Sequence, residues 1–157
     1  KKFKIKLGFH GHNNFGSAIS NSIIACLYGA EIIDVSIKGF GAGAGNTQMD
    51  IFLTVLEKIG YKGNVKLGEI YNIAKKFPKI LEKEKIKYSN PFSEPKNIMS
   101  ANYGLFSGFA SKVDYFSDKF KLDDIDAFKA IGAKRLVAGQ EDLIFNILYN
   151  LKKRKKT

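Results

Sequence analysis

The distribution of apolar and polar residues divides the chain into two parts. The first part shows both strand and helix periodicity, and the second part shows helix periodicity alone. Residues 3–9 alternate apolar residues with lysines, which is the period-two pattern of a strand. Apolar residues at helical spacing follow over 17–28, and a second, β-branched strand is expected over 32–37. An amphipathic helix is expected over 48–59. This order predicts a βαβα unit with parallel strands, covered by its helices.

The second part of the chain predicts helices and no further strand. A helix perturbed at Pro78 is expected over 67–83, and two prolines indicate a loop over 88–95. Further helices are expected over 97–120, 124–131 and 140–153, the first of them interrupted near Gly104 and Gly108, with Asp123 or Asp124 as the N-cap of the second. We therefore divide the chain into an α/β region, 1–62, and an all-helical region, 63–157.

Two parallel strands do not form a stable sheet by themselves, because their open edges remain available for pairing. The chain also begins on Lys1, inside the first predicted strand and without an initiating methionine. We therefore expect it to be a fragment of a larger protein, with the rest of the sheet upstream or in another chain.

The two histidines of the chain, His10 and His12, lie in the segment GFHGHNN directly after the first apolar run. In a strand this spacing points both imidazoles to the same side, so one metal ion can take a nitrogen from each at roughly 2.1 Å. The alternative is that the two side chains share a face by chance and are satisfied by hydrogen bonds. The motif is short, and by its spacing alone it leaves both interpretations open.

Bulk composition fits one ordinary globular domain of 157 residues, with 45% apolar and 13% aromatic residues. Cys26 is the only cysteine, so an intrachain disulfide is excluded. Neither a signal peptide nor an apolar stretch long enough to span a membrane is visible. These features favour the cytoplasm.

The formal net charge is +11, but the lysines are scattered and only residues 152–156 form a cluster. A basic tail can bind nucleic acid or an anionic membrane. We favour a solvated helix end whose charges complement the helix dipole, and we predict neither a nucleic-acid nor a membrane partner.

A glycine-rich loop over 39–45 formally matches a dinucleotide-binding fingerprint through Gly39, Gly41 and Ala44. That fingerprint requires an acidic residue at the end of a second strand, whereas Glu57 falls inside a predicted helix. The preferred interpretation is a tight loop whose backbone amides approach an anionic group. Asn46 then either faces a metal or substrate or caps the following helix.

Three segments carry a resemblance to a known family: GFHGHNN, IIDVSIKGFGAGAGNTQ (32–48) and RLVAGQEDLI (135–144). In this order the chain resembles the C-terminal half of bacterial 4-hydroxy-2-oxovalerate aldolases. The first two segments are shared by the wider DRE-TIM metallolyase superfamily, which includes 3-hydroxy-3-methylglutaryl-CoA lyase and isopropylmalate synthase.

The resemblance implies a TIM (β/α)₈ barrel whose last two strands are residues 3–9 and 32–37, followed by a helical domain that contacts a partner. It implies that His10, His12 and an aspartate of the first barrel strand bind a divalent metal, usually Mn²⁺, with Mg²⁺ or Co²⁺ as alternatives. Asn46 is a further candidate ligand. The family's aspartate, a neighbouring arginine and a base histidine have no counterpart in this chain, so an upstream half with an Asp-Thr-x-Arg-Asp type motif is required.

The implied function is the C-terminal part of an aldolase that cleaves 4-hydroxy-2-oxovalerate, or a related 4-hydroxy-2-oxo acid, to pyruvate and an aldehyde. The chain alone is expected to lack activity, and the implied partner is an acylating aldehyde dehydrogenase. One alternative is an acyl-CoA-dependent synthase or lyase of the same superfamily, against which the GQED segment argues. The other is a non-catalytic basic helical interaction module, against which His10, His12 and Asn46 argue.

The chain departs from the family in a segment that resembles GYAGVYSSF. When residues 107–109 are aligned with the last three residues of GYAGVYSSF, Phe106 falls where the family has an active-site tyrosine. Tyr103, one helical turn earlier, can supply a hydroxyl instead, and both residues are equally compatible with core aromatics. Asp34, in the last predicted strand, is expected to have a structural hydrogen-bonding role.

Overall fold

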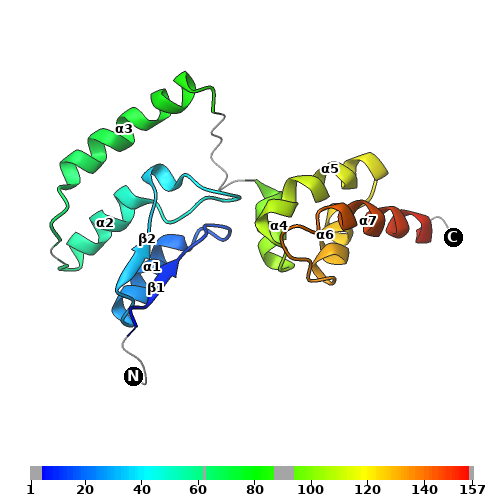
Figure 1. Ribbon diagram of the computed structural model, residues 1–157, viewed down its shortest axis with the longest axis horizontal. Coiled ribbons are helices and arrows are strands. Elements are labelled where there is room, and N and C mark those ends of the chain that lie inside the picture. Colours follow the sequence, from blue (N-terminus) through cyan, green and yellow to red (C-terminus); the bar gives the residue numbers. More distant parts are fainter. Residues whose placement is uncertain (1–4, 62, 87–93, 156–157) are drawn as a thin grey trace. The chain divides into compact units, whose positions relative to one another are not determined.

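A computed structural model describes residues 5–61, 63–86 and 94–155 and divides the chain into two compact units, Lys1–Phe92 and Ser93–Thr157. The first unit combines two strands with helices, and the second is helical in its described part (Figure 1). The boundary lies later than the expected division between residues 62 and 63. The reason is α3 (Leu67–Lys83), which packs against α2 (Met49–Lys58) and therefore belongs to the first unit.

The two described strands, β1 (Gly8–His10) and β2 (Ile32–Asp34), pair in parallel as predicted. The register places Gly8 opposite Ile32 and His10 opposite Asp34. Both strands differ from the expected ranges 3–9 and 32–37. Residues 5–7 are not in the strand, residues 3 and 4 lie outside the described part, and the 3₁₀ helix η1 (Ile37–Gly39) follows β2. His10 therefore lies inside β1 rather than beyond its end.

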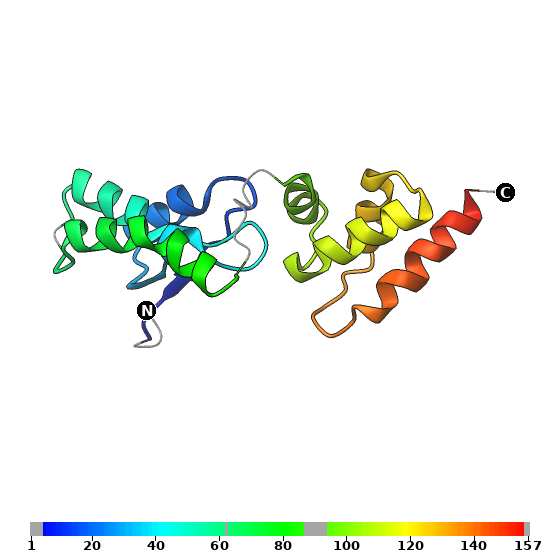
Figure 2. The ribbon, with the colours of Figure 1, turned by 90° about the horizontal axis from the view of Figure 1, so that it is seen from above.

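The helices of the first unit agree with the sequence pattern. α1 (Ala18–Leu27) and α2 fall within the predicted ranges 17–28 and 48–59. α3 spans the predicted 67–83 and contains Pro78. Figure 2 shows α2 and α3 side by side, and α3 also contacts η1.

The second unit contains α4 (Pro95–Asn102), the 3₁₀ helix η3 (Ser107–Phe109), α5 (Ala110–Phe120), α6 (Asp124–Gly132) and α7 (Asp142–Arg154). The expected interruption of the 97–120 stretch is confirmed, because α4 ends before Gly104, which has a φ of +67°. The expected cap of α6 is Asp123, whose side chain accepts a hydrogen bond of 3.1 Å from the Asp126 amide. The loop predicted over 88–95 falls mostly on residues 87–93, which lie outside the described residues.

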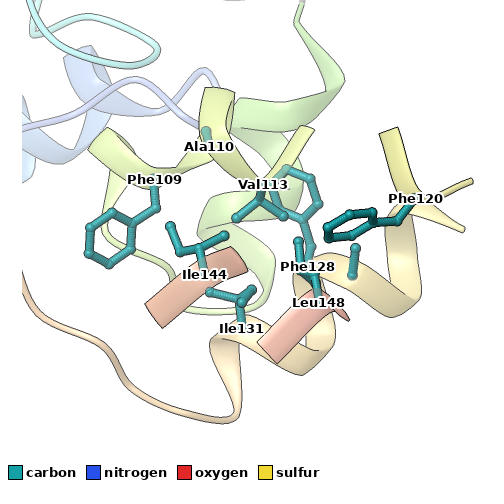
Figure 3. Packing of buried hydrophobic residues seen from close by; sticks show 9 residues of the cluster. Phe109, Ala110, Val113, Phe120, Phe128, Ile131, Ile144 and Leu148 are labelled. Atoms are coloured by element: carbon teal, nitrogen blue, oxygen red, sulfur yellow. The ribbon is translucent and has the colours of Figure 1, made fainter. Parts of the chain in front are cut away.

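A hydrophobic core of its own stabilises the second unit. Its members come from η3, α5, α6 and α7, and the fully buried large ones are Phe109, Val113, Phe128, Ile131, Ile144 and Leu148 (Figure 3). Burying an aliphatic or phenyl side chain contributes about 1.5–3 kcal/mol. The second unit is thus a packed helical module rather than an extension of the sheet.

The basic cluster forms the end of α7, with Lys152, Lys153 and Arg154 in its last turn. The Nζ atoms of Lys152 and Lys153 lie 5.4 Å and 4.7 Å from the ring centroids of Phe120 and Tyr149. Cations at a helix C-terminus complement the helix dipole, as the sequence interpretation expected. The helices of the described residues include none with the length and hydrophobicity that a membrane span requires.

Candidate metal centre

His10 and His12 lie on the same side of the chain, as their spacing predicts. Their ring centroids are 4.9 Å apart and the rings meet edge to face at 78°. His10 is the last residue of β1, so the pair lies at the carboxyl end of a parallel strand. Two imidazoles at this separation are close enough to donate one nitrogen each to a single metal ion.

A second strand-like contact fixes His12 opposite Asn46 in an isolated antiparallel bridge. The amide of Asn13 donates to the carbonyl of Gly45 at 2.9 Å, and the amide of Thr47 donates to the carbonyl of Gly11 at 3.1 Å. These two bonds flank the pair, so His12 and Asn46 form a narrow, non-hydrogen-bonded pair whose side chains are close neighbours on one face.

The structure excludes one of the two roles expected for Asn46, and its role toward a metal or substrate stays a prediction. The N-cap of α2 is Gln48, so Asn46 does not cap that helix. The Asn46 Nδ2 atom donates to the Phe40 carbonyl at 3.5 Å, whereas Oδ1 is buried and has no hydrogen-bond partner among the described residues. A buried unpaired acceptor costs about 1–3 kcal/mol. A carboxamide oxygen on the residue paired with His12 is a donor that divalent cations accept, and a bound cation would satisfy it.

The glycine loop makes room for this carboxamide. A Cβ atom on Gly41 would lie 2.5 Å from Nδ2 and 2.6 Å from Cγ of Asn46. Gly39 and Gly45 have φ values of +70° and +81°, which side chains rarely allow. Glu57 lies inside α2, as predicted, and not at the end of a strand, where a dinucleotide-binding fingerprint requires its acidic residue. The predicted approach of loop amides to an anionic group stays a prediction.

A buried polar contact behind the histidines was missed by sequence reasoning. The hydroxyls of Ser22, on α1, and Thr47 are hydrogen bonded at 2.7 Å, and both are buried. A Cβ on Gly11 would lie 2.9 Å from Thr47 Oγ1 and 3.0 Å from Phe9 Cε1. Only glycine therefore fits between the two histidines, and Gly11 itself was the available signal in the sequence.

Asp34 makes the hydrogen bond that its position suggested, although its partner was not foreseen. Its Oδ2 atom lies 3.1 Å from Nδ1 of His10, the residue opposite it across the parallel pair. Within the described part of the chain, no group of three or more His, Cys, Asp or Glu side chains could hold a metal ion. The site therefore offers two imidazoles and one amide oxygen, without a carboxylate ligand.

Tyr103 and Phe106, the residues aligned near the family's tyrosine, belong to the second unit. Tyr103 is the C-cap of α4 and packs, partly buried, against the core of that unit. Phe106 is 47% exposed and meets Phe109 edge to face at 5.3 Å. Their roles toward a substrate stay predictions.

Two family models match the chain. The model described as HMGL-like covers residues 1–76, and the DmpG-like communication domain covers residues 91–153. The two matches fall on the two structural units. The chain thus combines an HMGL-like α/β segment with a helical segment that matches the DmpG-like communication domain.

Curated relatives narrow this class further. The chain is 41% identical to the 4-hydroxy-2-oxovalerate aldolase of Pectobacterium atrosepticum over 150 residues, and 40% identical to that of Spirochaeta aurantia over 150 residues. The enzyme of the same name from Burkholderia pseudomallei is 37% identical over 140 residues. These alignments cover 96%, 96% and 89% of this chain but 42%, 42% and 39% of the relatives.

A solved structure agrees with these relatives. The crystal structure of the N-terminal domain of a candidate aldolase from Bacteroides vulgatus superimposes with a TM-score of 0.56 and 32% identity, covering 72% of this chain and 35% of that one. The chain belongs to the 4-hydroxy-2-oxovalerate aldolase family, and it spans about two fifths of the length of the curated relatives described above.

Proposed function

We propose that this chain forms the C-terminal part of a divalent-metal-dependent aldolase that cleaves 4-hydroxy-2-oxovalerate, or a related 4-hydroxy-2-oxo acid, to pyruvate and an aldehyde. The observation that carries the proposal is the juxtaposition of His10 and His12 with Asn46, whose Oδ1 atom is buried and lacks a partner among the described residues. The names of the curated relatives supply the substrate class.

The donor set suits a borderline to hard cation. Mn²⁺ accepts two imidazole nitrogens together with a carboxamide oxygen, and it is the metal we propose. Mg²⁺ and Co²⁺ are the alternatives. The described residues contain no carboxylate that completes the set. We propose that an aspartate from a segment upstream of this chain supplies it.

A divalent metal bound here supplies Lewis-acid polarisation of the keto oxygen of a 2-oxo acid. The chain's own part is to place the two imidazoles and the Asn46 carboxamide near one another. The backbone bonds that flank His12 and Asn46 keep these two residues opposite each other before any metal binds. The general base for the substrate hydroxyl is proposed to come from the upstream segment.

We further propose that β1 and β2 are the seventh and eighth strands of a (β/α)₈ barrel. Their parallel pairing, with α1 as the connection and the metal donors at the carboxyl end, fits the position of active sites in such barrels. The HMGL-like match and the B. vulgatus structure support this architecture.

The test is made in the full-length protein, with His10→Ala and His12→Ala as variants and Asn21→Ala, an exposed residue of α1, as the matched control. Bound metal is measured by mass spectrometry and pyruvate release by a coupled assay. We expect each histidine variant to lose metal and at least about 100-fold in cleavage rate, since removing even an indirect support costs about 10–100-fold. Full metal content in both variants, or no cleavage of any 4-hydroxy-2-oxo acid by the metal-loaded wild type, would contradict the proposal.

We propose an acylating aldehyde dehydrogenase as the protein partner, bound through the second unit. The match of residues 91–153 to a communication domain supports this. The second unit also exposes large apolar side chains, including Tyr115 at 58% and Val137 at 62%. Sedimentation of the full-length protein mixed with such a dehydrogenase is expected to give a complex, and separate sedimentation of the two proteins would argue against it.

A further inference from the structure

The carboxylate of Asp34 lies 3.1 Å from one particular nitrogen of His10, Nδ1. We propose that Asp34 is a positioning residue that holds the Nδ1 hydrogen of His10, so that the imidazole presents Nε2 to the metal. The inference rests on the proposed function, because it concerns the same metal centre, and it names which nitrogen binds and what orients it.

The geometry that joins the two residues is set by the sheet and not by a flexible loop. His10 and Asp34 are the last residues of β1 and β2 and lie directly opposite each other in the parallel register. Paired residues of adjacent strands project from the same face of the sheet. The contact is therefore a consequence of strand pairing.

The chemistry of the pair selects one tautomer of His10. A neutral imidazole carries a single N–H, and an ionised carboxylate can only accept a hydrogen bond. The proton consequently lies on Nδ1, which donates to Asp34 Oδ2, and the lone pair lies on Nε2. Carboxylates commonly fix metal-bound histidines in this way, which aligns the ring and makes it a better donor.

Two observations argue that Asp34 supports a ligand and is not a ligand itself. Among the described residues, no three His, Cys, Asp or Glu side chains lie together in a way that could hold a metal ion. This holds even though Asp34 contacts His10. The Asp34 side chain is also 63% exposed. A pair this exposed stabilises a fold little, so the consequence of losing it is expected at the metal centre and not in folding.

The experiment compares Asp34→Ala and Asp34→Asn with wild type in the full-length protein. Asn retains an acceptor oxygen without the charge. Glu31→Gln is the matched control, because it removes an exposed carboxylate immediately before β2. The readouts are the His10 tautomer, from ¹⁵N NMR of metal-free protein well above the usual imidazole pKa, and the Mn²⁺ dissociation constant, from calorimetry. A His10→Ala variant assigns the NMR signals.

We expect His10 to carry its proton on Nδ1 in the wild type and to lose this preference in Asp34→Ala. Mn²⁺ binding should weaken about 10–100-fold in Asp34→Ala, less in Asp34→Asn, and remain unchanged in Glu31→Gln. A proton on Nε2 in the wild type, or unchanged Mn²⁺ affinity in Asp34→Ala, would overturn the inference while leaving the proposed metal site intact. Failure of the wild type to bind Mn²⁺ would overturn both, so the two failures are distinguishable.

Discussion

Replacing Gly41 by alanine tests how the glycine loop shapes the candidate metal centre. Gly41 is exposed and its φ lies outside the left-handed region, so its backbone accepts an alanine. The new methyl group would nevertheless collide with the side chain of Asn46. The substitution therefore disturbs one candidate ligand and leaves both histidines unchanged.

The size of the effect follows from the distances. The new Cβ would lie 2.6 Å from Cγ and 2.8 Å from Oδ1 of Asn46. Non-bonded carbon atoms settle at roughly 3.5–4.0 Å, so the carboxamide must move by about 1 Å. Metal–ligand distances tolerate changes of only about 0.2 Å, so Oδ1 would no longer be in position to act as the proposed ligand. We estimate this loss as about tenfold in metal affinity, or about 1.4 kcal/mol.

A double-mutant cycle separates this mechanism from a general distortion of the loop. Mn²⁺ affinity is measured by calorimetry for the wild type, Gly41→Ala, Asn46→Ala and the double variant. If the methyl group acts through the carboxamide, it weakens binding about tenfold in the wild type and has no further effect when Asn46 is already alanine. Equal weakening in both backgrounds would refute the steric argument, as would unchanged binding in Gly41→Ala.

Further predictions concern stability and reactivity. Gly132→Ala should lower the free energy of unfolding by about 2 kcal/mol, because the new Cβ would lie 2.1 Å from the Tyr103 carbonyl oxygen. Gly68→Ala should raise the free energy of unfolding by about 0.5–1 kcal/mol, because a Cβ there would meet nothing within 4 Å. Urea denaturation followed by circular dichroism measures both, and the reverse order would contradict the packing argument. Asp123→Ala should cost about 1 kcal/mol through loss of the α6 N-cap, measured in the same way. Burial raises the pKa of the Cys26 thiol, so iodoacetamide should modify it more slowly than a free thiol near neutral pH, and denaturant should abolish the difference.

The helices could be predicted from the sequence because their signals are local. The spacing of apolar residues and the glycine after the helix place α1 within one residue at each end, and Asp123 acts as the cap that its type suggests. The strands and the unit boundary could not be predicted as well. Strand length depends on the neighbouring strand, and the assignment of α3 to the first unit depends on the surface of α2 against which it packs.

The candidate site likewise combines one local feature that the sequence predicts with pairings between distant segments that it does not. The shared face of His10 and His12 follows from a spacing of two residues, whereas the partner of each histidine depends on pairing between distant segments. The parallel register brings Asp34 to His10, and the bridge between the two loops brings Asn46 to His12. No periodicity in the sequence specifies either pairing, so the sequence left open whether Asn46 is a ligand or a helix cap.

The glycines of the site gain a physical explanation that their motif did not provide. In the sequence they indicated a loop whose amides approach an anion. In the structure, a side chain at Gly41 would occupy the space of the Asn46 carboxamide, and one at Gly11 would press on Thr47, whose amide holds the bridge beside His12. Close approach of backbone to neighbouring groups, and not only a positive φ, therefore selects glycine here. If the metal centre is organised in this way, substitutions at Gly11 and Gly41 should impair it through different donors, His12 and Asn46 respectively.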